Sequence, residues 1–193
     1  CTAGAFQHTT SICKSRRITP TFVFEKVANH IVALYNLGTF DGQDVSNTVW
    51  SFEKDRVPHP QLFEKVANHI VALDNLKDFA PQAFSTTVYA YATAGVSHPL
   101  LFEKLGNHIV SLEHLGTFKP QELSNIVLAF AKAEISHPAL FDKVANHIVA
   151  LDQLGDFGSQ ALANTVWSFE KAVVSHPLLF ENVADHIVAL DNL

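Results

Sequence analysis

A phenylalanine recurs every 39 residues along this chain, with no insertion or deletion between its copies: Phe24, Phe63, Phe102, Phe141 and Phe180. The residues around it are repeated as well. The stretch 175–193 reads SHPLLFENVADHIVALDNL, and related stretches cover 136–154, 97–115, 58–76 and, more divergently, 19–37. A fixed period between about 20 and 50 residues is typical of repeat arrays, in which each unit packs only on its neighbours. The period therefore predicts a stacked array and not a globule with one central core.

The period divides the chain into a partial repeat at 19–39 and four full repeats at 40–78, 79–117, 118–156 and 157–193. Each repeat holds two segments with apolar residues at helical spacing, and none shows the alternating pattern of a strand. We predict an all-α fold, a right-handed α-solenoid of stacked two-helix repeats with a 39-residue period.

Capping residues mark where the first helix of a repeat begins. Asp41 is a good N-cap, and Pro81, like its equivalent Pro120, suits the first helical turn. Phe79, just before the helix, can pack on Phe84 as a hydrophobic staple.

The second helix is expected to begin with Ser97 or His98 as its cap, followed by Pro99. It is expected to end near Asn75, because Asn tolerates the left-handed conformation that stops a helix.

One face of the first helix is apolar. Val45, Val49 and Phe52 lie at i, i+4 and i+7, and this stripe should face the second helix. Small residues flank it and should let neighbouring first helices approach closely: Ser51, Ala90, Ala129 and Ser168. The repeated phenylalanines of the second helix should be buried: Phe63, Phe102 and Phe141.

The opposite face of the first helix combines an amide, an aromatic ring and a lysine. In the repeat 40–78 it holds Gln43, Asn47, Trp50 and Lys54, which helical spacing places within about 60° of one another. A ring can stack on a base, an amide can read the edge of the base, and a lysine can reach a phosphate. The candidate RNA-binding residues are Asn47, Thr86, Asn125, Asn164, Trp50, Tyr89, Trp167, Lys54, Lys132 and Lys171. Leu128 takes the aromatic position in the repeat 118–156. In an alternative arrangement the rings wedge between adjacent first helices and the Asn side chains bridge the repeats.

Nine of the eleven histidines follow the repeat in two series: His59, His98, His137, His176, and His30, His69, His108, His147, His186. Stacked helices lie about 8–10 Å apart, whereas zinc needs nitrogens at about 2.0–2.1 Å. We therefore interpret these histidines as capping and inter-repeat packing residues and expect no metal site. The second helix should also expose Glu64, Lys65, Asn68 and His69. No catalytic constellation stands outside the repeated frame, so we expect neither an enzyme nor a cofactor.

The charge is unevenly distributed along the chain. Residues 1–18 carry three basic residues and no acid, whereas the remainder carries 10 basic and 19 acidic residues. This balance argues against a broad phosphate-binding surface. The segment 1–18 is either a degenerate first helix, whose place it fills in the 39-residue phase, or a transit-like segment. Cys1 and Cys13 fit neither a disulfide framework nor a zinc site. No apolar run is long enough to span a membrane, and the chain is expected to be part of a longer protein.

The first helix resembles that of pentatricopeptide repeats, in residues 46–49 leading to Lys54 and in residues 163–166 leading to Lys171. In that family an Asn, Thr or Ser near the helix start reads one base. The period is closer to that of octotricopeptide repeats. The whole unit is similar to the helical arrays of the FAST-kinase-like and RAP-domain group, and to the helical domain of the mitochondrial RNA-editing substrate-binding complex. The resemblance covers residues 19–193. It implies single-stranded RNA binding in RNA processing, editing, stability or translation, in a mitochondrion or chloroplast.

Two functions therefore stand side by side. The first is an RNA-binding α-solenoid, with other proteins of an RNA-processing complex as further partners. The second is a protein-binding scaffold, in which the outward stripe holds an extended peptide. The stripe and the resemblance favour RNA, whereas the acidic balance and the near-identity of the repeats favour a protein partner.

Overall fold

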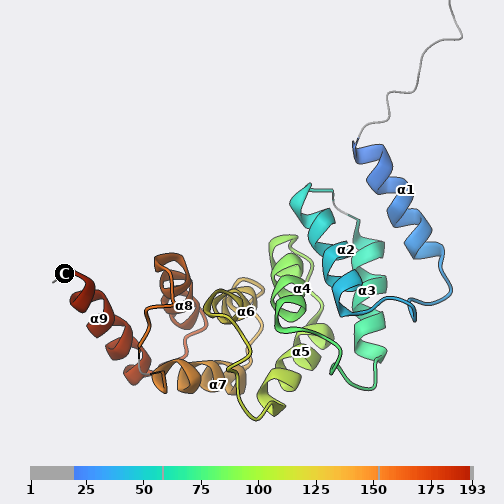
Figure 1. The fold of residues 1–193 in the computed structure, drawn as a ribbon. Coiled ribbons are helices and arrows are strands. Elements are labelled where there is room, and N and C mark those ends of the chain that lie inside the picture. The colour runs from blue at the N-terminus through green and yellow to red at the C-terminus, as the bar shows by residue number, and fades with distance from the viewer. Residues whose placement is uncertain (1–19, 58, 152, 192–193) are drawn as a thin grey trace, which may run out of the picture.

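The computed structural model describes residues 20–57, 59–151 and 153–191, and within them the regular elements are all α-helices (Figure 1). The helices are α1 (Pro20–Ala33), α2 (Gly42–Lys54), α3 (Pro60–Ala72), α4 (Pro81–Thr93), α5 (Pro99–Ser111), α6 (Pro120–Lys132), α7 (Pro138–Val149), α8 (Ser159–Lys171) and α9 (Pro177–Asp191). The predictions for the segment 1–18, including Cys1 and Cys13, lie outside the described residues. The fold is an all-α solenoid of helical repeats, so the predicted fold class is confirmed.

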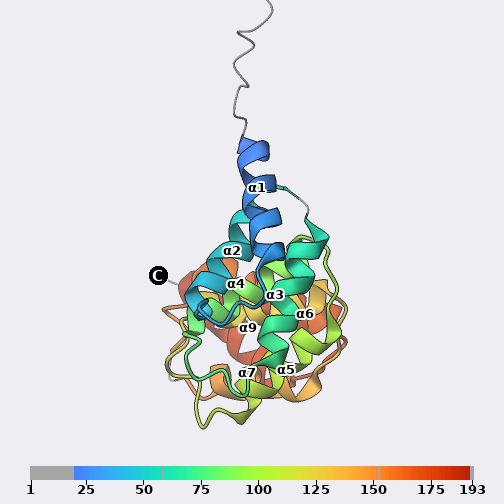
Figure 2. The ribbon, with the colours of Figure 1, turned by 90° about the vertical axis from the view of Figure 1, so that its right-hand side faces the viewer.

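The helices form two layers along an arc. The first helices α2, α4, α6 and α8 pack side by side, and α1, α3, α5, α7 and α9 form a second, more loosely spaced layer. Figure 1 shows the first-helix layer on the inner side of the arc. In the view turned by 90°, α1 and α3 lie in front and the later repeats lie behind them (Figure 2).

Small side chains allow the close packing of the first-helix layer. Ala90, Ala129 and Ser168 are completely buried, as predicted, and Ser51 is half-buried. A side chain of this size brings neighbouring helix backbones close together. The inner layer is therefore the tighter one, and this difference in spacing produces the curvature seen in Figure 1.

The helix starts are formed as the sequence predicts. Asp41 accepts from the backbone N–H of Asp44 at 2.8 Å, and the Asp44 carboxylate accepts from the Asp41 N–H in return. Pro81 occupies the first turn of α4, and the rings of Phe79 and Phe84 lie 5.5 Å apart. The Asp41 and Asp44 bonds satisfy backbone donors that a helix leaves free at its start. Pro81 has no N–H to leave unpaired, and the ring contact fixes how the chain enters α4.

The helix stops differ from the prediction. Among the described residues, positive φ occurs at one repeat position, at the end of the first helix: Arg56, Gly95, Glu134 and Val173. The next backbone N–H then donates to a carbonyl five residues earlier, as from Val57 to Phe52 at 3.0 Å. This is the Schellman arrangement, which uses up the last carbonyls of the helix.

The predicted left-handed stop at Asn75 was wrong. Helix α3 already ends at Ala72, and the Asn75 side chain instead accepts from the backbone N–H of Lys77 at 3.1 Å. A short side chain that bonds two residues ahead forms a turn without a positive φ.

The core is a ladder of aromatic rings that joins successive repeats. Phe63, Phe102 and Phe141 are fully buried, as predicted. These three residues and Phe24 each lie edge-on to a ring of the next first helix at about 5 Å, in the pairs Phe24–Phe52, Phe63–Tyr91, Phe102–Phe130 and Phe141–Phe169. Such pairs contribute about 0.5–1.5 kcal/mol beyond the burial of their area. The ladder fixes how each second helix meets the following repeat.

Candidate nucleic-acid interface

The amide positions of the predicted site lie on the first-helix layer. In α2 the Gln43 amide donates to the Asn47 side-chain oxygen at 2.9 Å, and in α6 Gln121 donates to Asn125 at 3.0 Å. The bond orients the Asn and leaves its NH₂ group as a donor for a ligand. Thr86 and Asn164 occupy the equivalent positions and are half-buried.

The aromatic positions fall into two kinds. Trp50 and Trp167 are each 45 % exposed and present part of a ring face for stacking. Tyr89 is half-buried, and Leu128 is only 6 % exposed, so the expectation that Leu128 lies on the outward stripe was wrong. The aromatic position of the stripe is accessible in the first and last full repeats, whereas in the two repeats between them its side chain is half-buried or buried. The alternative arrangement, in which the side chain wedges between adjacent first helices, fits Tyr89 and Leu128 better than it fits Trp50 and Trp167.

The lysines of the stripe differ in their intramolecular contacts. Lys132 places its ammonium 5.6 Å from the centre of the Tyr89 ring, and Lys171 forms an ion pair with Glu134 at 3.0 Å. Lys54 is exposed at the end of α2. Exposed contacts of this kind are worth only about 0–1 kcal/mol. A phosphate can therefore take the place of the Tyr89 ring beside Lys132, or of the Glu134 carboxylate beside Lys171.

The lysine of the second helix is not free, contrary to the expectation for Lys65. Its ammonium donates to the carbonyls of Val32 and Leu34, at the end of α1. Lys104 bonds Val71 and Leu73 in the same way, and Lys143 bonds Leu112 and Glu113. These half-buried lysines cap the preceding second helix, and we exclude them from the candidate site.

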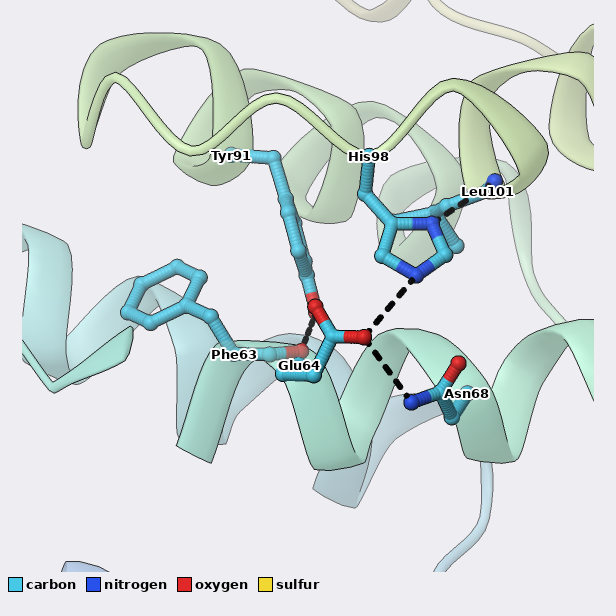
Figure 3. A network of polar contacts seen from close by, with 6 residues as sticks. All are labelled: Phe63, Glu64, Asn68, Tyr91, His98 and Leu101. Atoms are coloured by element: carbon cyan, nitrogen blue, oxygen red, sulfur yellow. Dashed lines mark hydrogen bonds and ion pairs between the residues drawn. The ribbon is translucent and has the colours of Figure 1, made fainter. Parts of the chain in front are cut away.

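The first histidine series caps the second helices, as predicted. A backbone N–H donates to the Nδ1 of His59, His98, His137 and His176 at 3.2–3.3 Å. Since Nδ1 accepts, the proton of the neutral ring is on Nε2. In His98 this nitrogen lies 3.9 Å from the Glu64 carboxylate on α3, which also accepts from Asn68 (Figure 3).

The same junction carries a buried hydroxyl. Tyr91 of α4 donates to the backbone carbonyl of Phe63 at 2.6 Å (Figure 3). Burial raises the pKa of Tyr91 well above its usual value, with the negative charge of Glu64 acting in the same direction. Tyr91 and His98 therefore hold the first two full repeats together and are not available to a ligand.

In the second histidine series His69, His108 and His147 are half-buried, which corrects the expectation that His69 is exposed, whereas His30 is exposed. His108 stacks on Phe84, with ring centres 5.0 Å apart. Burial lowers the pKa of His69, His108 and His147 below its usual value. For His147 the charges of His114 and Lys143 act in the same direction, and for His69 the backbone of Phe40 opposes the shift.

The part of the chain that the structure describes contains neither a cluster of metal ligands nor a membrane-spanning helix. Its His, Cys, Asp and Glu side chains form no group of three that could hold a metal ion. None of the helices there is both long and apolar enough to cross a membrane.

Sequence reasoning missed one exposed residue. Tyr35, in the loop after α1, is 99 % exposed and lies at the edge of a cavity of about 760 Å³. Leu37 of the loop and Glu64 and Asn68 of α3 line the same cavity. The repeat carried a signal, because the equivalent residues Asp74 and Glu113 are acidic and Tyr35 departs from that pattern.

The two layers and the partly exposed stripe define a helical-repeat protein of the α-solenoid class. Residues 8–192 match the family described as RNA-editing substrate-binding complex 6 protein. Because the match covers nearly the whole chain, the chain belongs to this family, which implies a role in an RNA-editing complex. No curated protein matches the sequence significantly. Of the resemblances considered from the sequence, the match supports the RNA-editing complex and gives no support to the octotricopeptide, pentatricopeptide or FAST-kinase-like groups.

Proposed function

We propose that this chain binds single-stranded RNA along its first-helix layer, as a non-enzymatic module of a mitochondrial RNA-editing complex. Trp50 and Trp167 stack on bases, the Asn and Thr positions contact base edges, and Lys54, Lys132 and Lys171 contact phosphates. The observation that carries the proposal is the pair of tryptophans, each exposed beside an amide and a lysine on its own helix. Family membership supports a ligand connected with RNA.

The test is a binding measurement on the full chain with a pool of single-stranded RNA at moderate salt. Trp50→Ala and Trp167→Ala should each weaken binding by about 1–3 kcal/mol, the usual loss when a stacking ring is removed. The matched control is Leu100→Ala, which removes a side chain of similar exposure from α5 in the other layer. If the folded chain binds no RNA in this pool, or if Leu100→Ala has the same effect, the proposal is wrong.

Two further variants separate the roles within the stripe. Replacing Lys54, Lys132 and Lys171 by Gln should weaken all RNAs alike and flatten the salt dependence, because phosphate contacts release counterions. Asn125→Ala should change base preference more than affinity, since contacts with base edges specify the sequence. Lys77→Gln, in an exposed loop, is the control for charge alone.

A protein-binding scaffold is the second candidate function. The acidic balance of residues 19–193 favours it, as do the contacts of Lys132 and Lys171 within the protein. It predicts no RNA binding at moderate salt. It also predicts a protein partner, recovered from the editing complex, whose binding Trp50→Ala and Trp167→Ala abolish.

A further inference from the structure

A groove of about 600 Å³ lies where the ends of α2 and α4 meet. Its lining includes the buried rings of Phe52 and Phe63 and the half-buried side chains of Val57 and Val96. Pockets for small molecules usually measure about 300–1,000 Å³ and combine apolar walls with a few polar groups. The groove therefore has a size that suits a small ligand, and its polar groups decide which ligand fits.

The apolar side of the groove is held in place by the junction between α3 and α4. The Phe63 ring lies edge-on to Tyr91 at 5.1 Å, and the Tyr91 hydroxyl donates to the Phe63 carbonyl at 2.6 Å (Figure 3). Two polar side chains of the lining are also bonded within the protein. Thr93 donates to the carbonyl of Tyr89 at 2.7 Å, and the Nδ1 of His59 accepts a backbone N–H at 3.2 Å.

The two charged side chains of the groove, Glu53 and Arg56, are not bonded in this way. Both belong to the end of α2, where the backbone N–H of Arg56 donates to the Glu53 carbonyl at 3.0 Å, so the side chains leave from one turn. Glu53 is half-buried and Arg56 is exposed. Within residues 20–57, 59–151 and 153–191, neither side chain takes part in an ion pair. A carboxylate acceptor and a guanidinium donor are thus available to the same ligand.

The equivalent junction between α6 and α8 is largely filled. There Glu134 takes the position of Arg56 and Lys171 takes that of Thr93, and these two side chains form an ion pair at 3.0 Å. The cavity that they line is about 190 Å³. Both junctions share the packing of the repeat, so the larger volume and the unpaired charges are particular to the α2 end of the array.

Guanine matches this pair of charged side chains. Its N1–H and N2 amino group can donate to one carboxylate, and its O6 and N7 can accept from one guanidinium. Adenine presents an amino group in place of O6, which would place a donor against the guanidinium. The flat face of the base can lie against Val57 and Val96. Proteins read single-stranded RNA by bonding the edges of unstacked bases in this manner.

We propose that the groove between the ends of α2 and α4 binds a guanine base, with Glu53 accepting from its N1–H and N2 amino group and Arg56 donating to its O6 and N7. That the base belongs to a bound RNA strand rests on the function proposed above, in which Lys54, also at the end of α2, contacts a phosphate. The groove gives the α2 end of the stripe a preference for one nucleotide.

Free mononucleotides test the groove separately from the stripe. In equilibrium dialysis the full chain should bind guanosine monophosphate at least about tenfold more tightly than adenosine monophosphate, because adenine cannot form the paired bonds. Inosine monophosphate, which lacks the N2 amino group, should fall between them. Glu53→Gln should abolish the preference. Arg56→Lys should reduce it, because lysine keeps the charge but lacks the two-pronged donor.

Two variants serve as matched controls. Glu170→Gln removes the same charge at the equivalent position of α8, and Trp167→Ala removes a ring of the stripe. Both should leave the preference for guanosine monophosphate unchanged. A second measurement uses uridine-rich RNA strands that carry one guanine or one adenine. The guanine strand should bind about tenfold more tightly, and Glu53→Gln should remove this difference.

Equal or absent binding of the guanosine and adenosine monophosphates would overturn the proposal, as would a preference that Glu53→Gln leaves intact. RNA binding without a preference for the guanine strand would contradict the groove and leave the proposed function standing. A preference among the mononucleotides without any RNA binding would support the groove and contradict the proposed function. A protein of the editing complex that needs Glu53 and Arg56, with no mononucleotide bound, would assign the groove to a protein partner and overturn the proposal.

Discussion

Four residues at one repeat position adopt the left-handed conformation, and only one of them is a glycine. Gly95 has φ +67°, and a Cβ added there would meet no atom within 4 Å. Val173 has φ 57° although it is β-branched and 90 % exposed. The strain at Val173 is therefore in the backbone alone, since the conformation itself is unfavourable for a side chain.

Val173→Gly should stabilise the protein by about 0.5–1 kcal/mol. Relief of about 1–2 kcal/mol of left-handed strain exceeds the entropy that a glycine adds to the unfolded chain. Urea unfolding measures the difference. Gly95→Ala is the reciprocal variant and should destabilise by about 1 kcal/mol, because it introduces the same strain without a steric clash. Equal stability of all three proteins would contradict this explanation.

In three of the four neighbouring pairs of second helices, a lysine of the later helix bonds the last carbonyls of the earlier one. Lys104 of α5 donates to the carbonyls of Val71 and Leu73 at the end of α3, the bond to Val71 being 2.8 Å long. In the last repeat Asn182 takes this position and makes one bond, to Val149 at 3.3 Å. The second-helix layer is loosely packed, so these bonds supply part of its cohesion.

Lys104→Met should destabilise the protein by about 1–3 kcal/mol. Met keeps most of the apolar stem but leaves carbonyl groups in a partly buried place without their charged donor. Chemical unfolding at constant pH provides the measurement. Lys77→Met, in an exposed loop, is the control and should change the stability by less than about 0.5 kcal/mol. Hydrogen exchange near residues 70–73 should rise in Lys104→Met, and unchanged exchange there would count against a capping role.

At the scale of the whole molecule, three half-buried histidines should make the stability depend on pH. Burial lowers the pKa of His69, His108 and His147 in the folded state. The unfolded chain, with a histidine pKa of about 6.5, then binds more protons below that pH than the folded chain does. Their contribution to stability is complete above the unfolded pKa and is lost as the pH falls from the unfolded pKa through the lowered folded pKa.

The free energy of unfolding should therefore fall between about pH 7.5 and pH 5.5. Urea titrations at several pH values test this. Replacing His69, His108 and His147 by Gln should flatten the profile in this range, whereas His30→Gln, at the exposed equivalent position of α1, should leave its shape unchanged. A profile that the triple variant does not change would show that other groups cause the dependence.

The candidate site could be predicted only in part. Asn47, Trp50 and Lys54 lie on an exposed face because helical spacing places them opposite the apolar stripe, and spacing is a local property. The burial of Leu128 and the ring contact between Tyr89 and Lys132 involve neighbouring helices. How far apart those helices lie is set by packing along the whole layer, which no single repeat encodes.

The sequence alone determined the all-α class, the helix starts and the buried phenylalanines, because periodicity, caps and staples act within a few residues. Only the tertiary structure showed that the left-handed stop falls at Arg56, Glu134 and Val173, residue types that do not signal it. It also turned Lys65 from an expected surface lysine into a cap for the preceding helix. These features join residues more than 30 positions apart or override a local preference. In a solenoid these features depend on the interfaces between repeats, because each repeat packs only on its neighbours and those contacts are not encoded in its own sequence.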